Sequence, residues 1–342
     1  MPELKGRTGA PWLLHTVSWC YQPRCETRKE PVALATLLLH HSSFANHKTS
    51  AGHPERPDRY RAVEAVLGQP QFDALVRERA EIADLDTTRY VHSNRYVDGL
   101  EAARPHEGYV YLDGGDTMME PSTWEVVLRG VGATVQAVDK VLDGEVQNAF
   151  VACRPPGHHA ESEQAMGFCL FNNISIGARH AQRNYGLTSV AIVDFDVHHG
   201  NGTQEIFYSD PSVLYASTHQ MPLFPGTGAA DETGVGNIFN SPLAAGDGGA
   251  ELREAFEDRI LPALSRFKPE LIILSAGFDA HERDPLGSLR MTADDFGWVT
   301  RELMKSAELH CQGRLVSVLE GGYDLQGLKD SVGAHVGELM KG

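Results

Sequence analysis

The sequence between residues 189 and 201 reads Ser-Val-Ala-Ile-Val-Asp-Phe-Asp-Val-His-His-Gly-Asn, and the fold can be inferred outward from it. Its first five residues are small or apolar, without polar alternation. Such a run is typical of a strand in a parallel sheet that is buried on both faces. The polar residues follow at the end of the predicted strand, where sites form in open α/β sheets.

Five further apolar runs predict parallel strands at residues 32–39, 149–153, 213–216, 270–274 and 315–319. Helical patterns lie between them, at residues 56–67, 123–142, 173–183, 250–265 and 293–309. Thr292 and Ser122, each followed three positions later by an acidic residue, are expected to cap two of these helices. The alternation predicts a single α/β domain with an open, mostly parallel sheet and helices on both faces.

Four of the predicted strands end in residues that carry chemistry. The segments that follow them are Arg154-Pro-Pro-Gly-His-His159, Asp194-Phe-Asp-Val-His-His-Gly-Asn201, Ser275-Ala-Gly-Phe-Asp279 and Glu320-Gly-Gly-Tyr-Asp324. Because the carboxyl ends of parallel strands meet at one edge of the sheet, all four segments are expected to form one site there.

Asp196, His198 and Asp279 are the predicted metal ligands. Residues two apart in extended backbone point to the same side, so Asp196 and His198 can bind one ion. Asp279 arrives from another strand. Three protein ligands and one open position are typical of a catalytic zinc site, although two carboxylates and an imidazole would also accept Fe(II) or Co(II).

His158 and His159 follow a rigid Arg-Pro-Pro-Gly turn that holds both imidazoles at the strand end. A histidine beside a metal site is a natural general base, because its pKa lies near neutrality and a polar partner can adjust it. Asp194 and Asn201 are the available partners.

Tyr323 follows two glycines, which let its phenol approach the metal. A phenol hydroxyl opposite a Lewis acid can donate to a developing oxyanion. Together these residues predict amide hydrolysis, in which a histidine accepts the proton of water and later protonates the leaving amine.

The composition argues against other classes of protein. The formal net charge of −16 argues against general nucleic-acid binding, which depends on clustered Lys and Arg, and is compatible with cationic substrates. No run of 18 apolar residues predicts a membrane span. The five cysteines are odd in number and form no C-x-x-C pair, which predicts a reducing, cytoplasmic setting.

Residues 1–31 mix basic and acidic residues without a continuous apolar core, so they match neither a secretory signal nor a transit peptide. We expect them to form an N-terminal extension, and residues 32–342 to form the catalytic domain.

These residues resemble the arginase/deacetylase superfamily, and within it the zinc-dependent histone deacetylases and their acetylpolyamine amidohydrolase relatives. The resemblance runs from about residue 32 to the C-terminus. It rests on the motifs Gly52-His-Pro-Glu-Arg-Pro57, Arg154-Pro-Pro-Gly-His-His159, Gly167-Phe168, Asp194-Phe-Asp-Val-His-His-Gly-Asn201, Phe224-Pro-Gly-Thr-Gly228, Ala276-Gly-Phe-Asp279 and Glu320-Gly-Gly-Tyr323.

The resemblance implies one zinc ion at the three predicted ligands, His159 as general base and acid, His158 as its electrostatic partner and Tyr323 as oxyanion donor. It implies that Phe168, beside Gly167, and Phe224 wall an apolar tunnel for the substrate stem. Asp116 would grip the substrate backbone at the rim.

Structural potassium is also implied by the resemblance. One ion would use Asp194, Asp196, His198 and Ser217, and a second would use backbone near Phe207 and Val213.

Asn201, where one branch of the family has Asp, is similar to class II. Tyr323 stands where a poorly active branch has His, so activity is expected. Leu286 stands where one polyamine-selective branch has Glu, which favours acyl-lysine over acetylpolyamine.

Two rival functions are a two-metal ureohydrolase and a non-catalytic acyl-chain or partner-binding domain. The first would need Asp residues at the places that Gly200 and Gly277 occupy, and the second would be favoured by loss of a ligand or of Tyr323. The sequence leaves open the acyl-chain length, the acylated partner and whether the chain forms a homo-oligomer.

Overall fold

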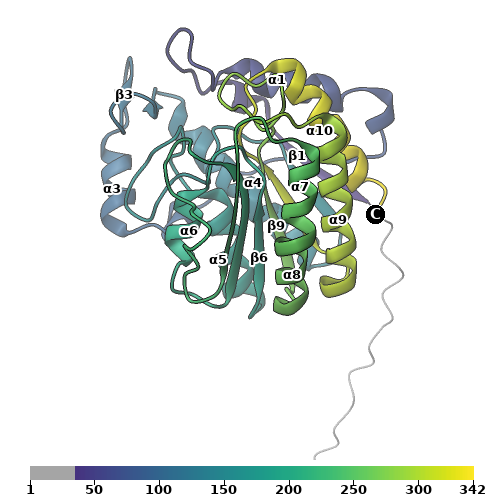
Figure 1. Ribbon diagram of the computed structural model, residues 1–342. Coiled ribbons are helices and arrows are strands. Elements are labelled where there is room, and N and C mark those ends of the chain that lie inside the picture. The colour runs from purple at the N-terminus through teal and green to yellow at the C-terminus, as the bar shows by residue number, and fades with distance from the viewer. Residues whose placement is uncertain (1–34) are drawn as a thin grey trace, which may run out of the picture. The chain divides into compact units, whose positions relative to one another are not determined.

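The computed structural model describes residues 35–342, which are built around one eight-stranded sheet (Figure 1). The strand order is β2-β1-β5-β10-β9-β6-β7-β8, and every neighbouring pair is parallel. The strands are β1 (Thr36–His40), β2 (Val76–Arg79), β5 (Asn148–Val151), β6 (Val190–Asp194), β7 (Val213–Gln220), β8 (Ile238–Leu243), β9 (Leu271–Ala276) and β10 (Leu315–Leu319). The predicted open α/β sheet is confirmed, and it is parallel throughout.

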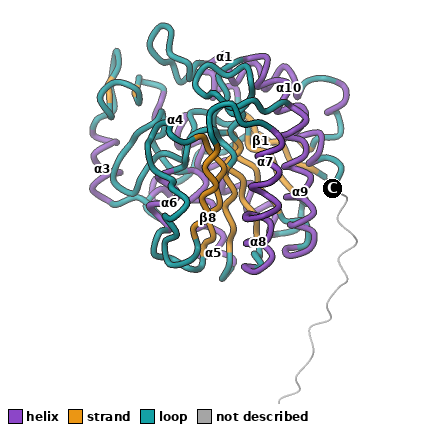
Figure 2. Tube along the Cα trace, in the orientation of Figure 1, coloured by secondary structure: helices purple, strands orange, loops and turns teal. Residues whose placement is uncertain are grey.

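Helices cover both faces of the sheet (Figure 2). One face carries α4 (Thr123–Leu142), α5 (Asn173–Tyr185) and α6 (Asn201–Phe207). The other carries α1 (Pro57–Leu67), α7 (Gly249–Ala255), α8 (Leu261–Phe267), α9 (Ala293–Cys311) and α10 (Leu325–Leu339). The remaining elements are η1 (Ser42–Ala45), η2 (Pro70–Phe72), α2 (Leu85–Thr88), α3 (Asn94–Ala102), the hairpin of β3 (Val110–Tyr111) and β4 (Met118–Met119), and the π-turn η3 (Phe256–Ile260).

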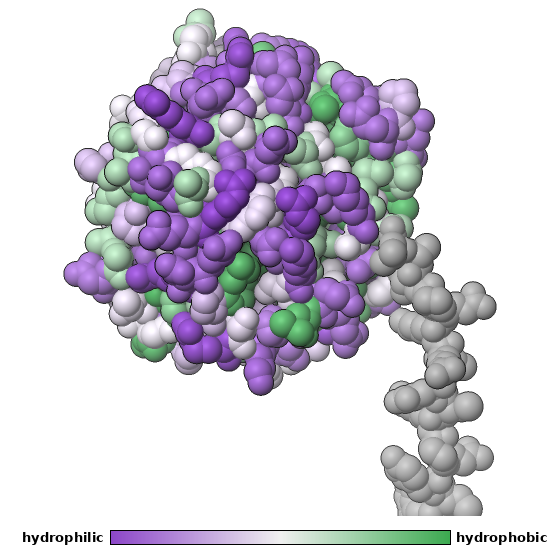
Figure 3. Space-filling model, turned by 45° about the vertical axis from the view of Figure 1, so that its right-hand side comes forward, coloured by the Kyte–Doolittle hydropathy of each residue, from purple (hydrophilic) through white to green (hydrophobic). Residues whose placement is uncertain are grey.

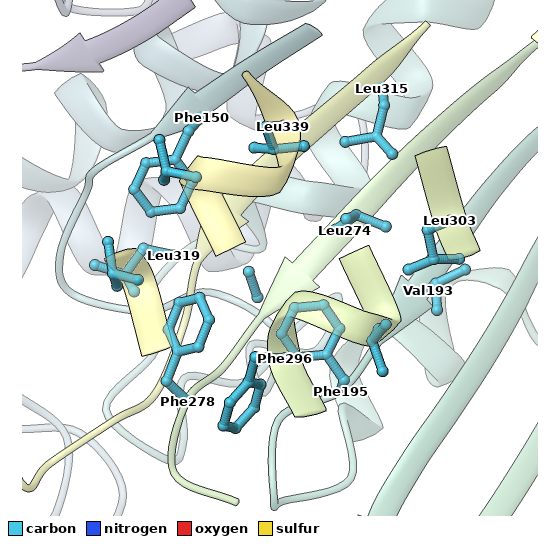
Figure 4. Packing of buried hydrophobic residues seen from close by; sticks show 14 of the residues in the cluster. Phe150, Val193, Phe195, Leu274, Phe278, Phe296, Leu303, Leu315, Leu319 and Leu339 are labelled. Atoms are coloured by element: carbon cyan, nitrogen blue, oxygen red, sulfur yellow. The ribbon is translucent and has the colours of Figure 1, made fainter. Parts of the chain in front are cut away.

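The central strands are buried on both faces because alternate residues enter different layers of the core. In β9, Ile272 and Leu274 pack beneath α9 and α10, whereas Leu271 and Ile273 pack beneath α4 and α5. Figure 4 shows the first layer, where aromatic and leucine side chains from strands and helices interdigitate. Burial of one such side chain contributes about 1.5–3 kcal/mol, so this layer anchors the strand ends that carry the site.

The sequence predicts six of the eight strands and misses the two edge strands. In β2, Val76 and the charged residues after it are largely exposed, because an edge strand needs no apolar face. In β8, Pro242 interrupts the pattern, which an edge strand tolerates. The helix α10 is also missed, because its glycines weaken the helical pattern and packing against α9 and α1 stabilises it instead.

Two local predictions need correction. The helix predicted at residues 250–265 is divided by the wider π-turn η3, after which α8 begins at Leu261 with Pro262 in its first turn. Ser122 makes no capping hydrogen bond and donates its hydroxyl to the carbonyl of Asn46, whereas Thr292 forms the predicted capping box. The predicted extension at residues 1–31 lies outside the described residues.

Hydrophilic residues dominate the face in Figure 3, where hydrophobic residues form small separate groups. Among the described helices, none has the length and apolar character that crossing a membrane requires.

The strand order brings the four chemistry-bearing segments together. They follow β5, β10, β9 and β6, which are consecutive neighbours in the middle of the sheet. Residues distant in sequence therefore converge at one edge of the sheet.

Candidate active site

Asp196, His198 and Asp279 meet above the ends of β6 and β9. Their possible ligand atoms all lie within 4.8 Å of one another, and all three side chains are buried. Nδ1 of His198 lies 3.0 Å from Oδ1 of Asp196 and 3.2 Å from Oδ2 of Asp279. We call these three residues the ligand cluster.

The ligand cluster has the donor set and the unmet charge that a divalent cation would satisfy. Oδ2 of Asp279 is buried without a hydrogen-bond partner among the described residues, because Nδ1 of His198, 3.2 Å away, bonds to Oδ1 of Asp196 instead. Burial and the carboxylate of Asp196 raise the pKa of Asp279. A cation would give this oxygen a partner and would offset the repulsion between the two carboxylates, so these residues fit the metal that the sequence predicts.

Two glycines make room for this cluster. A Cβ atom at Gly277 would lie 2.1 Å from Oδ2 of Asp196, and one at Gly321 would lie 2.0 Å from Oδ2 of Asp279. The amide of Gly321 instead donates to Oδ2 of Asp196 over 2.9 Å. The backbone at Gly277 and Gly321 thus comes so close to the two carboxylates that a side chain there would displace a metal ligand. A two-metal site would also require Asp at position 277, where this chain has Gly277.

The tandem histidines are held by different partners. Nδ1 of His158 lies 3.0 Å from Oδ2 of Asp194. Burial lowers the pKa of His158, but the carboxylates of Asp196 and Asp194 outweigh this effect and raise the pKa above its usual value. Nδ1 of His159 lies 2.9 Å from Oδ1 of Asn201. Burial and the neighbouring His158 and His198 hold the pKa of His159 well below its usual value.

The orientation of Asn201 decides which nitrogen of His159 is free. The Asn201 amide nitrogen donates to the Glu161 carboxylate over 2.8 Å, so its oxygen faces His159. Nδ1–H of His159 therefore donates to Asn201, and Nε2 is left as the acceptor in the neutral ring. His159 also lines the cavity described next.

A cavity of about 240 Å³ leads from the surface to the ligand cluster. Its walls are mainly apolar, and the lining comprises Asp116, His159, Gly167, Phe168, His198, Leu223, Phe224, Leu286 and Tyr323. Phe168 packs edge-on against Tyr323 at 5.8 Å between ring centroids, and Phe224 packs against His159 at 5.1 Å. All the residues predicted for the tunnel and its rim thus line one cavity.

Gly167 brings Phe168 into this wall. Gly167 and Phe168 have φ angles of 57° and 69°, and a Cβ atom at Gly167 would lie 2.4 Å from the ring of His159. Position 167 of this left-handed turn therefore requires glycine. The amide of Gly167 donates to Oδ2 of Asp113 and the amide of Phe168 donates to Oγ1 of Thr117, and these two hydrogen bonds hold the turn.

Tyr323 stands at the cavity and is supported both at its backbone and at its ring. Its amide donates to Oδ2 of Asp284 over 2.6 Å, and the guanidinium carbon of Arg59 lies 4.8 Å from the ring centroid. Burial raises the pKa of Tyr323, so the phenol keeps its proton at neutral pH. The hydroxyl has no hydrogen-bond partner among the described residues and is free to donate.

A second buried polar group supports the site, and no pattern in the sequence predicted it. Arg154 grips the Glu55 carboxylate with two bonds of 2.7 and 2.6 Å, and Arg59 adds a third of 3.2 Å. Arg59 also donates to the carbonyls of Gly322 and Glu320. We call Glu55, Arg59 and Arg154 the arginine cluster.

Two carboxylates behind the site were also missed as functional positions. Glu320 accepts from the amides of Gly157 and His158, and Asp284 accepts from Tyr323. Glu320 and Glu55 lie within the motifs Glu320-Gly-Gly-Tyr323 and Gly52-His-Pro-Glu-Arg-Pro57, but no spacing rule connects them with their partners.

The residues expected at potassium sites divide into two groups. Asp194 and Ser217 are paired in register on β6 and β7, beside Asp196 and His198, so the four residues expected for one ion lie together. The carbonyls of Phe207 and Val213 converge instead on Nδ2 of Asn237, each at 2.9 Å. The second expected ion does not fit, because a side-chain nitrogen already fills the space between its ligands.

Comparison with known proteins agrees with this geometry. The family model of the histone deacetylase domain matches residues 53–339. Histone deacetylase 10, chloroplastic, of Oryza sativa subsp. japonica is 40% identical over 315 residues, covering 86% of this chain and 71% of its own. A histone deacetylase-like amidohydrolase of Pseudomonas aeruginosa is 39% identical over 294 residues, covering 84% and 77%.

A solved structure, that of the HDA15 HD domain, superimposes with a TM-score of 0.85 at 36% identity, covering 90% of this chain and 88% of that one. The family implies a metal cofactor and acylated amine substrates, in accord with the buried Asp-His-Asp group. The chain therefore belongs to the histone deacetylase family and is a hydrolytic deacetylase.

Proposed function

We propose that this chain, through a catalytic domain at residues 32–342, is a zinc-dependent deacylase that hydrolyses acetyl-lysine amides. One observation carries the proposal: a buried Asp-His-Asp cluster with an orphaned oxygen lies at the end of an apolar cavity that His159 and Tyr323 also line. A zinc ion held by Asp196, His198 and Asp279 would polarise the acyl carbonyl and ease the deprotonation of water.

His159 is the general base and then the general acid. Its Nε2 faces the cavity as an unprotonated acceptor, because Nδ1–H is donated to Asn201. Its depressed pKa keeps this nitrogen free for the proton of water. Once protonated, Nε2 can pass the proton to the leaving amine.

His158 and Asp194 adjust the charge next to this base. His158 stacks beside His159 with ring centroids 4.0 Å apart and is bound to the carboxylate of Asp194. A positive charge on His158 opposes protonation of His159, which favours return of the proton to the product.

Tyr323 donates its hydroxyl proton in a hydrogen bond to the oxyanion of the tetrahedral intermediate. Its phenol is neutral and has no competing acceptor among the described residues. One pre-oriented donor of this kind contributes about 10²–10³ in kcat.

The tunnel would hold the extended methylene stem of the substrate between Phe168 and Phe224, with Gly167 and Leu286 completing its wall. Asp116 would accept from the substrate backbone at the rim. The runner-up substrate is an acetylpolyamine or another small acylated amine, which the same stem-binding walls would accept. Leu286 offers no charge to an internal ammonium, which favours acyl-lysine.

We further propose one structural potassium ion, held by Asp194, Asp196, His198 and Ser217 beneath the zinc site. The proposed location is the cytoplasm, because the cysteines of the described residues are free and buried, as in a reducing compartment.

The test is hydrolysis by the zinc-loaded chain of an acetyl-lysine peptide, longer acyl-lysine peptides and acetylated polyamines, each with and without chelator. We expect the acetyl-lysine peptide to be cleaved best and chelation to abolish cleavage. Absence of hydrolysis of every substrate by protein that retains one zinc ion per chain would overturn the proposal.

A further inference from the structure

A second recess opens beside the acyl tunnel and shares Tyr323 with it. Its volume is about 450 Å³, and Lys48, His53, Arg56 and Tyr109 are among its lining residues. Its lining also includes Pro285, next in the chain to Leu286 of the tunnel. A substrate whose acyl group lies in the tunnel would therefore place the atoms beyond its amide near this recess.

The charge of the recess is opposite to that of the chain as a whole, which is −16. Lys48 and Arg56 line it, and no described carboxylate does. Lys48 makes no ion pair with any described residue. Nε of Arg56 lies 3.8 Å from Oδ2 of Asp58, at the outer limit of an ion pair, with half of the Arg56 side chain exposed. Both cations are thus available to a ligand.

The loop that carries these cations is held in place. Thr49 Oγ1 donates to the carbonyl of Glu55 over 2.7 Å, and the hydroxyl of Tyr109 donates to the carbonyl of Thr49 over 3.3 Å. The Glu55 carboxylate is anchored in turn by Arg154. Lys48 and Arg56 therefore extend from fixed backbone, which lowers the entropy cost of binding.

We infer that this cationic recess makes the enzyme prefer acyl-lysine substrates with a carboxylate close to the acylated side chain. The inference rests on the deacylase function proposed above. A carboxylate in the recess would meet two positive charges, whereas the free ammonium groups of an acylpolyamine would be repelled by them. Exposed pairs of this kind correspond to about a three- to tenfold preference in kcat/KM.

The test uses amidated acetyl-lysine peptides with Asp and Glu neighbours and their Asn and Gln counterparts. A second pair, blocked acetyl-lysine with a free C-terminal carboxylate or an amide, distinguishes an acidic side chain from a chain terminus. Acetylspermidine serves as the positively charged substrate, which the recess should repel. The double variant Lys48→Ala/Arg56→Ala is compared with Arg301→Ala/Lys305→Ala, which removes the same charge from the exposed surface of α9.

We expect the acidic-to-neutral ratio of kcat/KM to fall to about 1 in Lys48→Ala/Arg56→Ala and to stay at wild-type level in the α9 variant. Raising the salt concentration should reduce the wild-type ratio. Equal rates on acidic and neutral peptides by the wild-type enzyme, or preference for acetylspermidine, would overturn the inference. Hydrolysis of the neutral peptide separately tests the deacylase function.

A second inference comes from Asn237, which lies far from the recess. Its Nδ2 lies within 2.9–3.0 Å of the carbonyls of Phe207, Asp210 and Val213, and its Oδ1 accepts from the amide of Val235. Three carbonyls converging on one point are suited to a monovalent cation. The side-chain amide nitrogen of Asn237 occupies this point instead, and its two N–H groups donate to the carbonyls.

The geometry points to the carboxamide of Asn237 as a built-in replacement for the second potassium ion that the family resemblance implies. The loop between α6 and β7 would then be stable without a cation at this place. Removal of the carboxamide, or its exchange for a carboxylate, would create a cation site among the three carbonyls.

The test is crystallography with Rb⁺ or Tl⁺, together with thermal unfolding in potassium or choline chloride, of wild type, Asn237→Ala and Asn237→Asp. We expect no anomalous scatterer among these carbonyls in wild type and one in Asn237→Asp. Potassium should raise the Tm of the variants by about 2 °C more than that of wild type. A cation bound by these carbonyls in the wild-type protein would refute the assignment, as would a potassium response that is the same in all three proteins.

Discussion

The ligand cluster and the arginine cluster are both buried, but they balance their charges in opposite ways. The arginine cluster joins the Glu55 carboxylate to two guanidiniums by three bonds of 2.6–3.2 Å. The ligand cluster joins two carboxylates to one imidazole and leaves Oδ2 of Asp279 without a hydrogen-bond partner among the described residues. The first is complete by itself, and the second needs a cation.

The contrast indicates what each cluster is for. Unpaired buried charge is costly, so a cluster that keeps it is suited to binding a metal rather than to stability. A satisfied buried network instead holds neighbouring segments in place. Arg59 links the helix α1 to the Gly321–Gly322 turn, and Arg154 links β5 to the loop at Glu55. The arginine cluster therefore holds in place the segment that carries Tyr323.

Asp279→Asn should have the largest effect, since it removes a ligand while keeping the side-chain volume. Loss of the metal costs several kcal/mol of transition-state stabilisation, so kcat/KM should fall by more than about 10³-fold. The Tm of the metal-free variant should be at least as high as that of metal-free wild type, because the substitution removes the repulsion between the carboxylates of Asp196 and Asp279. Zinc content, activity and thermal unfolding test this, with the exposed Asp258→Asn as control. A metal-free variant that is much less stable than metal-free wild type would contradict the contrast.

Arg154→Met should act through stability. It leaves Glu55 buried with one guanidinium, and breaking a buried ion pair typically costs about 3–5 kcal/mol. Urea unfolding of the metal-free protein measures the loss. Arg301→Met, which removes an exposed ion pair with Glu338, should change the free energy of unfolding by less than about 1 kcal/mol. Similar losses in the two variants would show that the arginine cluster carries no special stability.

Tyr323→Phe should lower kcat by about 10²–10³-fold with unchanged zinc content, because it removes only the oxyanion donor. Tyr208→Phe, at an exposed position, is the matched control. Wild-type kcat in Tyr323→Phe would remove the proposed role of the hydroxyl.

Acid should weaken the arginine cluster by a smaller amount. Burial raises the pKa of Glu55, but Arg154 and the other neighbouring cations outweigh it and lower that pKa from 4.5 to about 2. The stabilisation is therefore complete above about pH 4.5 and is lost as the pH falls toward 2. About 1 kcal/mol should disappear between pH 6 and pH 4. Unfolding of wild type and Glu55→Gln over this range checks this: the loss specific to Glu55 should be absent from the variant, and parallel curves would contradict it.

The sequence determined the central strands and most of the candidate site. Buried parallel strands must be apolar along their whole length, so their runs are visible in one dimension. Asp196 and His198 could be paired from their spacing, because extended backbone repeats every two residues. Asp279, His159 and Tyr323 could be joined to them because each follows a strand, and the carboxyl ends of parallel strands share one edge.

Tertiary structure alone decided the edges and the supports. The strands β2 and β8 are exposed or contain proline, and α10 depends on neighbouring helices, so local patterns do not reveal them. The contact of Glu55 with Arg154 joins residues 99 positions apart. The Asn237 carboxamide likewise finds its carbonyls only after the loop has closed. Hydrogen bonds require distance and direction in space, and sequence spacing supplies these only within one element of regular backbone.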